Sequence, residues 1–398
     1  MTVMDVLPAM PFEQEDILRI APEYLRLQTI APAVRVTTPA GDTGWLVTRH
    51  AEVKELIADR RVGRTHREPA KAARVSQSLL LGGPIGDFDT EHTVHDEVRA
   101  MLAPAFTARR TALLREFVTR SVAEVLDGIA RRPQPVELHD QLSFRLPLLV
   151  ICTMLGIPES EWPKFEGISH RIAVADDRES AAVSLVSLIQ FMQEMLEVKR
   201  GDLGDDLISD LLRADARTPV GAERLSFVAA SLLFAGHETI ASRIDFGIMM
   251  LLVNPDAMRV AMADDRGMAG CVEEILRLAT PNDLGQARYA REEITLGDGI
   301  VINEGDALIL AIGAANRDPA VFDDPLRMDA TRRPNPHLTF GHGKHFCLGA
   351  SLARLELGIV FDQLFQKFPD LALAVPAGEI ELRNTQVTGG IVALPVRW

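Results

Sequence analysis

One cysteine in a glycine-rich loop constrains the fold of this chain more than any other feature. Cys347 lies within residues 340–349, and residues 350–368 directly after it carry the pattern of a long helix. A cysteine at a helix N-terminus meets the positive end of the helix dipole and free backbone N–H groups, which stabilise a thiolate able to bind a metal. Gly343 and Gly349 would let the backbone turn sharply and approach a flat ligand closely. A buried, inert cysteine is the competing interpretation, and it would be preferred if Cys347 stood alone.

A second constraint is the longest helical pattern, residues 223–253, which is rich in Leu, Phe, Ala and Met. Its middle holds Gly236 and three polar residues, His237, Glu238 and Thr239. A glycine in a helix interior costs up to about 1 kcal/mol relative to alanine, so Gly236 needs a reason. Close approach of a flat ligand, or a local widening of the helix, would supply one, and such irregularities often mark functional sites.

Three motifs, taken together, resemble the signatures of the cytochrome P450 family. The family's haem-binding signature, Phe-x-x-Gly-x-His/Arg-x-Cys-x-Gly, matches Phe340, Gly343, His345, Cys347 and Gly349. Upstream, residues 235–239 (Ala-Gly-His-Glu-Thr) are similar to its oxygen-activation motif, and Glu274 with Arg277 resembles its Glu-x-x-Arg pair. The order of the three motifs along the chain and the spacing between them also agree with those of the family. The resemblance covers essentially the whole chain and is closest to soluble bacterial members of the actinobacterial type.

The resemblance implies the cytochrome P450 fold, which is mainly α with small β-sheets and has a long central helix over a haem with a cysteine-ligand loop. We expect one domain over residues 1–398, helix-rich at about 90–280 and strand-containing at about 30–60 and 285–398. No Ser-, Gly- or Pro-rich linker and no internal repeat interrupts the chain. The hydrophobic share of 47% provides for a large core.

Apolar spacing and turn residues predict the individual elements. The expected helices are 17–28, 50–58, 91–102, 109–130, 140–155, 159–173, 179–199, 223–253, 273–279 and 350–368. The expected strands are 44–48, 286–289, 294–296, 300–302 and 307–312, with short strand-like runs in 371–396.

By resemblance, Cys347 is the metal ligand, the sole protein ligand of the haem iron. The same signatures imply that further residues lie against the haem, namely Phe340, Gly349, Ala235 and Gly236. The Glu-x-x-Arg pair would be a buried network that braces the cysteine loop and takes no part in the chemistry; an exposed ion pair at this spacing would contribute little.

Thr239 and Glu238 are the expected catalytic residues. By resemblance, Thr239 would donate a hydrogen bond, through water, to dioxygen, and Glu238 would help to relay protons from solvent. A threonine that only bonds the carbonyl of its own helix is the competing interpretation. Arg243 and Asp245, further along the same helix, have no predicted role.

Four residues match family positions that bind the haem propionates: His95, Arg99, Arg288 and His345. His95 and Arg99 are four residues apart on a predicted helix and share one face. A bidentate cation such as Arg99 suits a carboxylate. His92, one turn earlier, competes with His95, and an exposed pair without a ligand is the alternative for both residues.

The resemblance implies a haem-thiolate monooxygenase with haem b (iron protoporphyrin IX) as cofactor and O2 as co-substrate. It would insert one oxygen atom into a C–H bond or an alkene of a medium-to-large apolar metabolite, in secondary metabolism such as antibiotic biosynthesis. The sequence contains no flavin or nicotinamide motif, so the electrons must come from an external ferredoxin and its reductase. Basic residues near the thiolate could steer an acidic ferredoxin; the candidates are Arg109, Arg110, Lys344 and Arg354.

Other functions use the same scaffold: a peroxygenase, an isomerase or dehydratase, or a non-catalytic haem sensor or carrier. Thr239 and Glu238 argue against the peroxygenase, because peroxide use does not need their proton relay. The formal net charge of −14 argues against nucleic-acid binding and against anionic membranes. Residues 1–14 lack a signal or anchor pattern, and no uncharged apolar run reaches the roughly 20 residues of a spanning helix. Three widely separated cysteines indicate a reducing cytoplasm.

Three stretches could form the substrate pocket. Residues 60–88 are irregular and include Leu79, Leu80 and Leu81, which either contact substrate or join the core. The same two interpretations hold for the apolar positions in 172–193, which are Val183, Val186, Ile189 and Met192. Residues 281–284 occupy a pocket-lining place by resemblance.

Overall fold

The computed structural model describes residues 6–76, 82–173, 178–281, 285–383 and 389–398. The chain divides into two compact units. The first unit contains residues 1–93 and 273–347, and the second unit contains residues 94–272 and 348–398. Each unit is therefore built from two stretches that lie far apart in the sequence. The expectation of a single domain stays a prediction.

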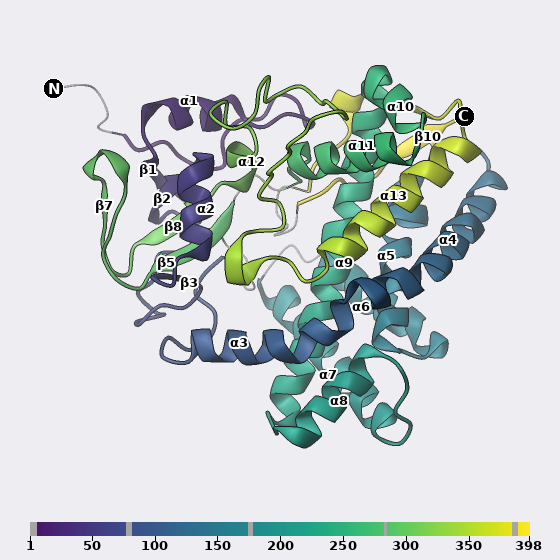
Figure 1. Ribbon diagram of the computed structural model, residues 1–398, viewed down its shortest axis with the longest axis horizontal. Coiled ribbons are helices and arrows are strands. Elements are labelled where there is room, and N and C mark those ends of the chain that lie inside the picture. Colours follow the sequence, from purple (N-terminus) through teal and green to yellow (C-terminus); the bar gives the residue numbers. More distant parts are fainter. Residues whose placement is uncertain (1–5, 77–81, 174–177, 282–284, 384–388) are drawn as a thin grey trace. The chain divides into compact units, whose positions relative to one another are not determined.

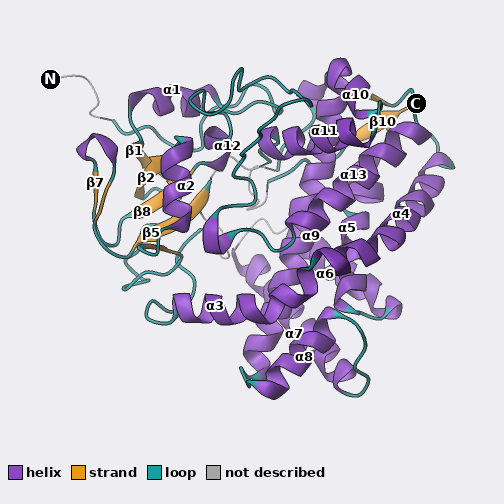
Figure 2. Cartoon of the chain, in the orientation of Figure 1, coloured by secondary structure: helices purple, strands orange, loops and turns teal. Residues whose placement is uncertain are grey.

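A five-stranded sheet forms the centre of the first unit (Figures 1 and 2). Its strands, in spatial order, are β1 (Ala33–Thr37), β2 (Thr43–Val47), β8 (Ala307–Leu310), β5 (Gln286–Ala290) and β3 (Val62–Gly63). β2 and β8 run parallel, and the other neighbours run antiparallel. All four residues of β8 are buried, as expected for a central strand with both faces covered. The other elements of this unit are α1 (Pro22–Ile30), α2 (His50–Ala58), α12 (Ile312–Ala315) and the two-stranded pair β6 (Ile294–Thr295) and β7 (Val301–Ile302).

Helices dominate the second unit. They are α4 (Ala108–Ala130), α5 (Arg145–Leu155), α6 (Trp162–Ala173), α7 (Arg178–Arg200), α8 (Leu207–Arg217), α9 (Ala222–Val253), α10 (Pro255–Ala261) and α13 (Ala350–Lys367). A small sheet joins β4 (Val136–Glu137), β10 (Pro395–Arg397) and β9 (Ala372–Leu373). The boundary between the units falls within α3 (Glu91–Leu102) and α11 (Asp265–Leu278).

The 32-residue helix α9 is the longest element, and it packs against α5, α7 and α13 (Figure 1). α9 and α13 approach so closely that a β-carbon on Gly247 would collide with the ring of Phe361. By length and composition α9 could cross a membrane, but 61% of its most apolar window is buried in the fold. A buried helix in the core of a globular protein has the same composition.

Most predicted elements are confirmed, and the chain is mainly α with small sheets, as predicted. α2 and α3 begin and end at the predicted residues. The first helix begins later than predicted, at Pro22, because proline is well placed in a first helical turn. The predicted helix 140–155 is split into a π-turn, His139–Ser143, and α5. The predicted strand 307–312 ends at Leu310, and β1, α8 and α10 were not predicted.

Candidate active site

Cys347 lies at the end of a tightly turned loop in the first unit. Gly341 and Gly343 have φ angles of +73° and +62°, which glycine adopts far more easily than other residues. The backbone N–H of Cys347 donates to the carbonyl of Phe340, with an N···O distance of 2.8 Å, and so closes the loop. The side chain of Cys347 is exposed. The loop therefore presents a thiol on its surface.

The predicted sharp turn is confirmed at Gly343 but is wrong at Gly349. Gly349 has φ −79° and ψ 4°, a conformation open to any residue. It is the N-cap of α13, so Cys347 stands two residues before that cap. The positive end of the helix dipole and the free N–H groups of the first turn are the local reason for expecting a thiolate at this position.

The other two cysteines are buried. Burial raises the pKa of the Cys152 thiol, and the thiol of Cys271 donates to the carbonyl of Ala257 at 3.2 Å. Cys347 is therefore the one exposed cysteine of the chain. Within the described residues no group of three or more His, Cys, Asp and Glu side chains could hold a metal ion. A metal at Cys347 would have to bring its remaining ligands with it, as the iron of a macrocycle does.

Glu274 and Arg277 form a buried ion pair on α11, in the first unit. Arg277 donates from Nε and Nη2 to the two carboxylate oxygens of Glu274, both at 2.7 Å, and neither side chain is exposed. The remaining Arg277 hydrogens go to three backbone carbonyls, those of Asn316, Pro325 and Arg327. Every charge of the pair is thus compensated inside the fold.

This pair is linked to the start of the cysteine loop. The side-chain oxygen of Asn316 accepts the N–H of Leu338 at 2.7 Å, and its amide donates to Thr339 Oγ1 at 3.0 Å. Thr339 in turn donates to the carbonyl of Leu276 at 2.7 Å. The geometry agrees with the prediction of a structural brace: α11 holds the residues from which the cysteine loop starts.

Thr239 lies on the open face of an otherwise buried helix in the second unit. Residues at four-residue spacing along α9 are exposed: Phe227, Ser231, Ala235 and Thr239. The hydroxyl of Thr239 donates to the carbonyl of Ala235 at 2.8 Å, which leaves the hydroxyl oxygen able to accept a hydrogen bond. This bond is the one expected if Thr239 only bonds a carbonyl of its own helix. It is also compatible with the predicted role, because the side chain remains accessible.

Gly236 has a packing reason as well as a predicted cofactor contact. A β-carbon at this position would lie 2.9 Å from Cδ1 of Ile151 on α5, which is too close. The helix is regular across residues 222–253, so the suggested local widening is absent from α9. The glycine lets α5 approach α9, and its contact with a haem stays a prediction.

His237 and Glu238 are buried beside Thr239. His237 Nε2 donates to the carbonyl of Phe144 at 2.7 Å, which leaves Nδ1 as the acceptor, 3.8 Å from Glu238 Oε1. Burial lowers the pKa of His237 to about 4, so its imidazole is neutral near pH 7. A neutral imidazole next to the carboxyl of Glu238 is suited to hold or pass a proton. His237 has no predicted role, although it is the third residue of the matched motif.

Asp245 belongs to a buried polar chain that the sequence did not reveal. Asp245 Oδ2 accepts from His139 Nδ1 at 2.7 Å, and His139 Nε2 accepts from Arg383 at 2.8 Å. Burial opposes a charge on His139, but the Asp245 carboxylate outweighs burial and raises the pKa of the ring. The charge of Arg383, which lies against Nε2, partly opposes this rise. These contacts tie α9 to the segment after α13.

The guanidinium of Arg288, in the first unit, has only neutral hydrogen-bond acceptors among the described residues. It donates to the carbonyl of Ala287 at 2.8 Å and to Gln286 Oε1 at 3.0 Å. Burial, with a contribution from the charge of Arg64, lowers the pKa of Arg288 to about 10. A carboxylate would offset this cost, so Arg288 fits a haem propionate. His345 is half-buried in the cysteine loop of the same unit.

The two residues predicted on α3 share a half-buried face, as expected. His95 Nδ1 lies 3.4 Å from Asp96 Oδ1, and Arg99 has no hydrogen bond or ion pair to any residue that the structure describes. His92, the competitor of His95, places its Nε2 3.0 Å from the carbonyl of Arg60. Their roles toward a propionate stay predictions.

The predicted pocket walls are only partly described. Leu79, Leu80 and Leu81 and residues 282–284 lie outside the described residues. On α7, Val183 and Val186 are exposed, whereas Met192 is completely buried in the core of the second unit, which Ile189 also contacts. The first pair is open to a ligand, and the second pair is core.

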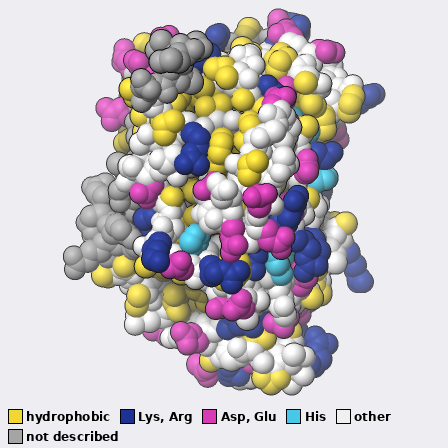
Figure 3. All heavy atoms as spheres, turned by 90° about the vertical axis from the view of Figure 1, so that its left-hand side faces the viewer, with side chains coloured by type: hydrophobic (Ala, Val, Ile, Leu, Met, Phe, Trp, Pro, Cys, Tyr) yellow, Lys and Arg dark blue, Asp and Glu magenta, His cyan; other side chains and the backbone are white. Residues whose placement is uncertain are grey.

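Arg110 does not join a basic patch. It forms ion pairs with Asp205, at 2.7 Å, and with Asp210, so two acidic residues neutralise it. Arg109 is exposed. On the face shown in Figure 3, basic and acidic side chains are interspersed, so that face has no extended field of one sign.

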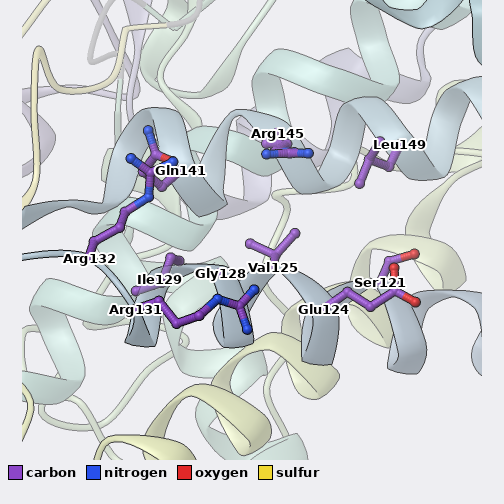
Figure 4. A pocket seen from close by; sticks show the side chains of 10 residues that line it. All are labelled: Ser121, Glu124, Val125, Gly128, Ile129, Arg131, Arg132, Gln141, Arg145 and Leu149. Atoms are coloured by element: carbon purple, nitrogen blue, oxygen red, sulfur yellow. The ribbon is translucent and has the colours of Figure 1, made fainter.

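A surface pocket of about 260 Å³ lies between α4 and α5 in the second unit, and its lining includes Arg131, Arg132 and Arg145 (Figure 4). None of the predicted site residues lines it. This pocket is therefore separate from the candidate site.

The sequence was compared with known families and proteins. The family described as Cytochrome P450 matches residues 268–388. Pentalenolactone synthase of Streptomyces exfoliatus is 38% identical, over 99% of this chain and 100% of that protein. Cytochrome P450 monooxygenase PikC of Streptomyces venezuelae is 35% identical, over 95% of this chain and 90% of that protein. The solved structure of substrate-free cytochrome P450 PimD, a polyene macrolide antibiotic pimaricin epoxidase, is similar over the full length of both chains, with a TM-score of 0.90 and 37% identity.

Proposed function

The chain belongs to the cytochrome P450 family, and we propose that it oxidises an apolar secondary metabolite at a haem held by Cys347. It is a haem-dependent monooxygenase with the cytochrome P450 fold, and it uses O2 and electrons from an external redox partner. The observation that carries the assignment of the ligand is the exposed thiol of Cys347, in a glycine-turned loop two residues before the cap of α13.

Haem with a thiolate ligand supplies O–O bond cleavage and the insertion of one oxygen atom into a C–H bond or an alkene. The protein supplies the sulfur ligand and the residues that hold the haem. Cys347 donates the sulfur, and the propionates would be held by His95, Arg99, Arg288 and His345. Phe340, Gly349, Ala235 and Gly236 would lie against the ring, in line with the signatures that they match.

Thr239 and Glu238 would deliver protons. Thr239 is exposed, and its hydroxyl oxygen can accept a hydrogen bond from a water while its hydrogen points to the carbonyl of Ala235. Exchanging that bond for one to the water would let the same hydroxyl donate, through this water, to dioxygen. Glu238, buried in the next position, would hold a proton at its carboxyl group and pass it to this water.

The substrate would be a medium-to-large apolar metabolite. Three similar proteins are named for antibiotic chemistry: pentalenolactone synthase, the pimaricin epoxidase, and mycinamicin IV hydroxylase/epoxidase of Micromonospora griseorubida. Phe227 on α9 and Val183 and Val186 on α7 expose apolar surface in the second unit, which supports an apolar ligand. Hydroxylation and epoxidation are both open to such a site.

A ferredoxin would be the electron donor, and the cytoplasm would be the location. None of the three cysteines, all of which the structure describes, forms a disulfide, which supports a reducing compartment. Arg109 remains a candidate for steering an acidic ferredoxin, together with Lys344 and Arg354, whereas Arg110 is removed from this set by its ion pairs.

The reduced, carbon monoxide-bound absorption spectrum tests the haem ligand. The Soret band typical of thiolate-ligated haem is expected for the wild type and for Cys271→Ala, and it should be lost in Cys347→Ser. Retention of the wild-type band in Cys347→Ser would remove Cys347 as the ligand. Turnover with a ferredoxin system, compared with turnover on hydrogen peroxide alone, separates a monooxygenase from a peroxygenase. Product formed in the absence of both the ferredoxin system and hydrogen peroxide would indicate an isomerase or dehydratase.

A further inference from the structure

Arg64 is a charged residue to which the proposed function gives no role. It directly follows β3, which pairs antiparallel with β5 and sets Gly63 opposite Tyr289. Arg64 is one residue beyond the paired stretch, and continuing the same register would bring it opposite Arg288, whose pKa is lowered in part by the charge of Arg64. Opposed residues on antiparallel strands present their side chains on the same face of the sheet. The two arginines therefore face the same region of the first unit.

The backbone of Arg64 is held in place by Glu91. A carboxylate oxygen of Glu91 accepts the N–H of Arg64 at 2.6 Å, and the other accepts the N–H of Thr65 at 3.3 Å. A β-carbon on Gly63 would collide with this carboxylate. The end of β3 is thus fixed, and the position of Arg64 is set by the fold.

The charge of Glu91 is already matched by another arginine. Arg291 donates from Nη1 to Glu91 at 3.0 Å, and the hydroxyl of Thr65 donates to the same oxygen. Burial would raise the pKa of Glu91, but these hydrogen bonds and the charge of Arg291 outweigh burial and lower it. Glu91 is therefore ionised and paired. Among the described residues, no carboxylate forms an ion pair with the guanidinium of Arg64 or Arg288.

Two opposed guanidinium groups are an unfavourable arrangement without an anion. Burial lowers the pKa of Arg64, and burial together with the charge of Arg64 lowers the pKa of Arg288; the charge of Glu91 opposes both shifts without cancelling either. The side chain of Arg64 nevertheless keeps accessible surface. A partly enclosed yet accessible cation beside a second cation is suited to bind a carboxylate, and a guanidinium can do so through two parallel hydrogen bonds.

We propose that Arg64 is a carboxylate-binding residue that acts beside Arg288. The carboxylate belongs either to a haem propionate or to an acidic substrate. The proposal rests on the proposed function, because both sources require a haem-containing active site. In the second case, Arg64 adds a specificity-determining residue to a pocket that is otherwise expected to select apolar molecules.

The test replaces Arg64 and compares it with a matched arginine. Arg64→Gln removes the charge and keeps a polar side chain, and Arg64→Lys keeps the charge. Arg60→Gln is the control, because Arg60 is exposed in the same segment and its side chain has no ion pair with a described residue. One measurement is the rate of haem transfer from the ferric holoenzyme to apomyoglobin. The other is the dissociation constant, from the Soret shift, of ω-imidazolyl alkanoic acids of increasing chain length and of their methyl esters.

The two sources of the carboxylate give different results. If Arg64 holds a propionate, Arg64→Gln releases haem about tenfold faster and the preference for acid over ester is unchanged. If Arg64 binds a substrate carboxylate, the wild type prefers the acid, and Arg64→Gln loses that preference by about tenfold at an unchanged rate of haem release. In either case Arg64→Lys restores part of the effect.

Other results count against the inference. Wild-type behaviour of Arg64→Gln in both measurements would overturn the role of Arg64 and leave the proposed function intact. The same holds if Arg60→Gln changes as much as Arg64→Gln. The reduced carbon monoxide spectrum of the wild type is recorded first, and a protein without thiolate-ligated haem would overturn the proposed function and this inference together.

Discussion

Arg277 donates to both carboxylate oxygens of Glu274 at 2.7 Å, and both side chains are completely buried. Glu23 and Arg26 on α1 have the same spacing and also form two hydrogen bonds, but they lie at the surface. The spacing alone therefore does not tell a structural ion pair from a marginal one. What separates the two pairs is burial, together with the backbone carbonyls and the Asn316 link that connect Arg277 to the cysteine loop.

Arg277→Ala should lower the free energy of unfolding by about 3–5 kcal/mol, because it removes the bidentate partner of the buried Glu274 carboxylate and leaves Arg332 Nε, at 3.2 Å, as its remaining cation. Arg26→Ala is the matched control and should cost less than about 1 kcal/mol. Urea unfolding followed by circular dichroism measures both. Equal costs for the two variants would mean that burial does not decide the strength of this pair.

Thr239→Ala should keep haem and the thiolate spectrum but divert electrons from product to hydrogen peroxide, because the hydroxyl that positions the proton-delivering water is lost. We expect the ratio of product to NADPH consumed to fall by at least about tenfold. The measurement uses a substrate found by turnover screening. Ser231→Ala is the control: Ser231 lies on the same open face of α9 and bonds the carbonyl four residues before it, as Thr239 does. Unchanged coupling in Thr239→Ala would remove Thr239 from proton delivery.

The helices and the loop carrying Cys347 could be predicted from sequence because their signals are local. Apolar periodicity and glycine placement gave α2, α3 and α9 with nearly the observed boundaries. The polar chain through Asp245 could not be predicted, because its members His139 and Arg383 are more than one hundred residues from Asp245. The hydrophobic periodicity of the sequence contains no information about a contact between residues so far apart.

The position of Arg64 shows the same limit. Its importance depends on the register of β3 against β5, which, continued by one residue, brings it toward Arg288, more than two hundred residues later. Strand pairing is decided by the whole sheet, so neither arginine signals the other in the sequence. Gly236 shows the converse case: the sequence marked it as unusual, and the structure adds a contact with α5 that the sequence could not specify.

Acid should destabilise the protein through His237. The pKa of this ring is lowered to about 4 in the fold, first by burial and then by the neighbouring His139 and His170, while Glu238 lies 3.8 Å away. The unfolded chain keeps a histidine pKa near 6.5. Below pH 6.5 the His237 ring of the unfolded state therefore binds a proton, whereas the ring of the folded state binds one only near pH 4. The stability that the neutral ring provides is complete above pH 6.5 and is lost as the pH falls.

Between pH 7 and pH 5, the free energy of unfolding should therefore fall by about 2 kcal/mol less in His237→Gln than in the wild type. The measurement is the free energy of urea unfolding at the two pH values. His170→Gln is the control, because His170 belongs to the same cluster but is about half exposed and contributes least to the His237 shift, so its removal should change the pH dependence far less than removal of His237. Parallel pH curves for the wild type and His237→Gln would show that the buried imidazole is not the source of acid sensitivity.

Gly247→Ala should destabilise the second unit by about 1–3 kcal/mol, since the new methyl group would meet the ring of Phe361 where α13 crosses α9. The ring is completely buried and has little room to move. Gly358→Ala, on α13, is the matched control: a β-carbon there meets no atom within 4 Å, and it should stabilise the helix by up to about 1 kcal/mol. Thermal unfolding compares the two variants, and shifts in opposite directions are expected. If both variants shift in the stabilising direction, helix propensity outweighs packing at Gly247, and the close approach of α9 to α13 does not depend on this glycine.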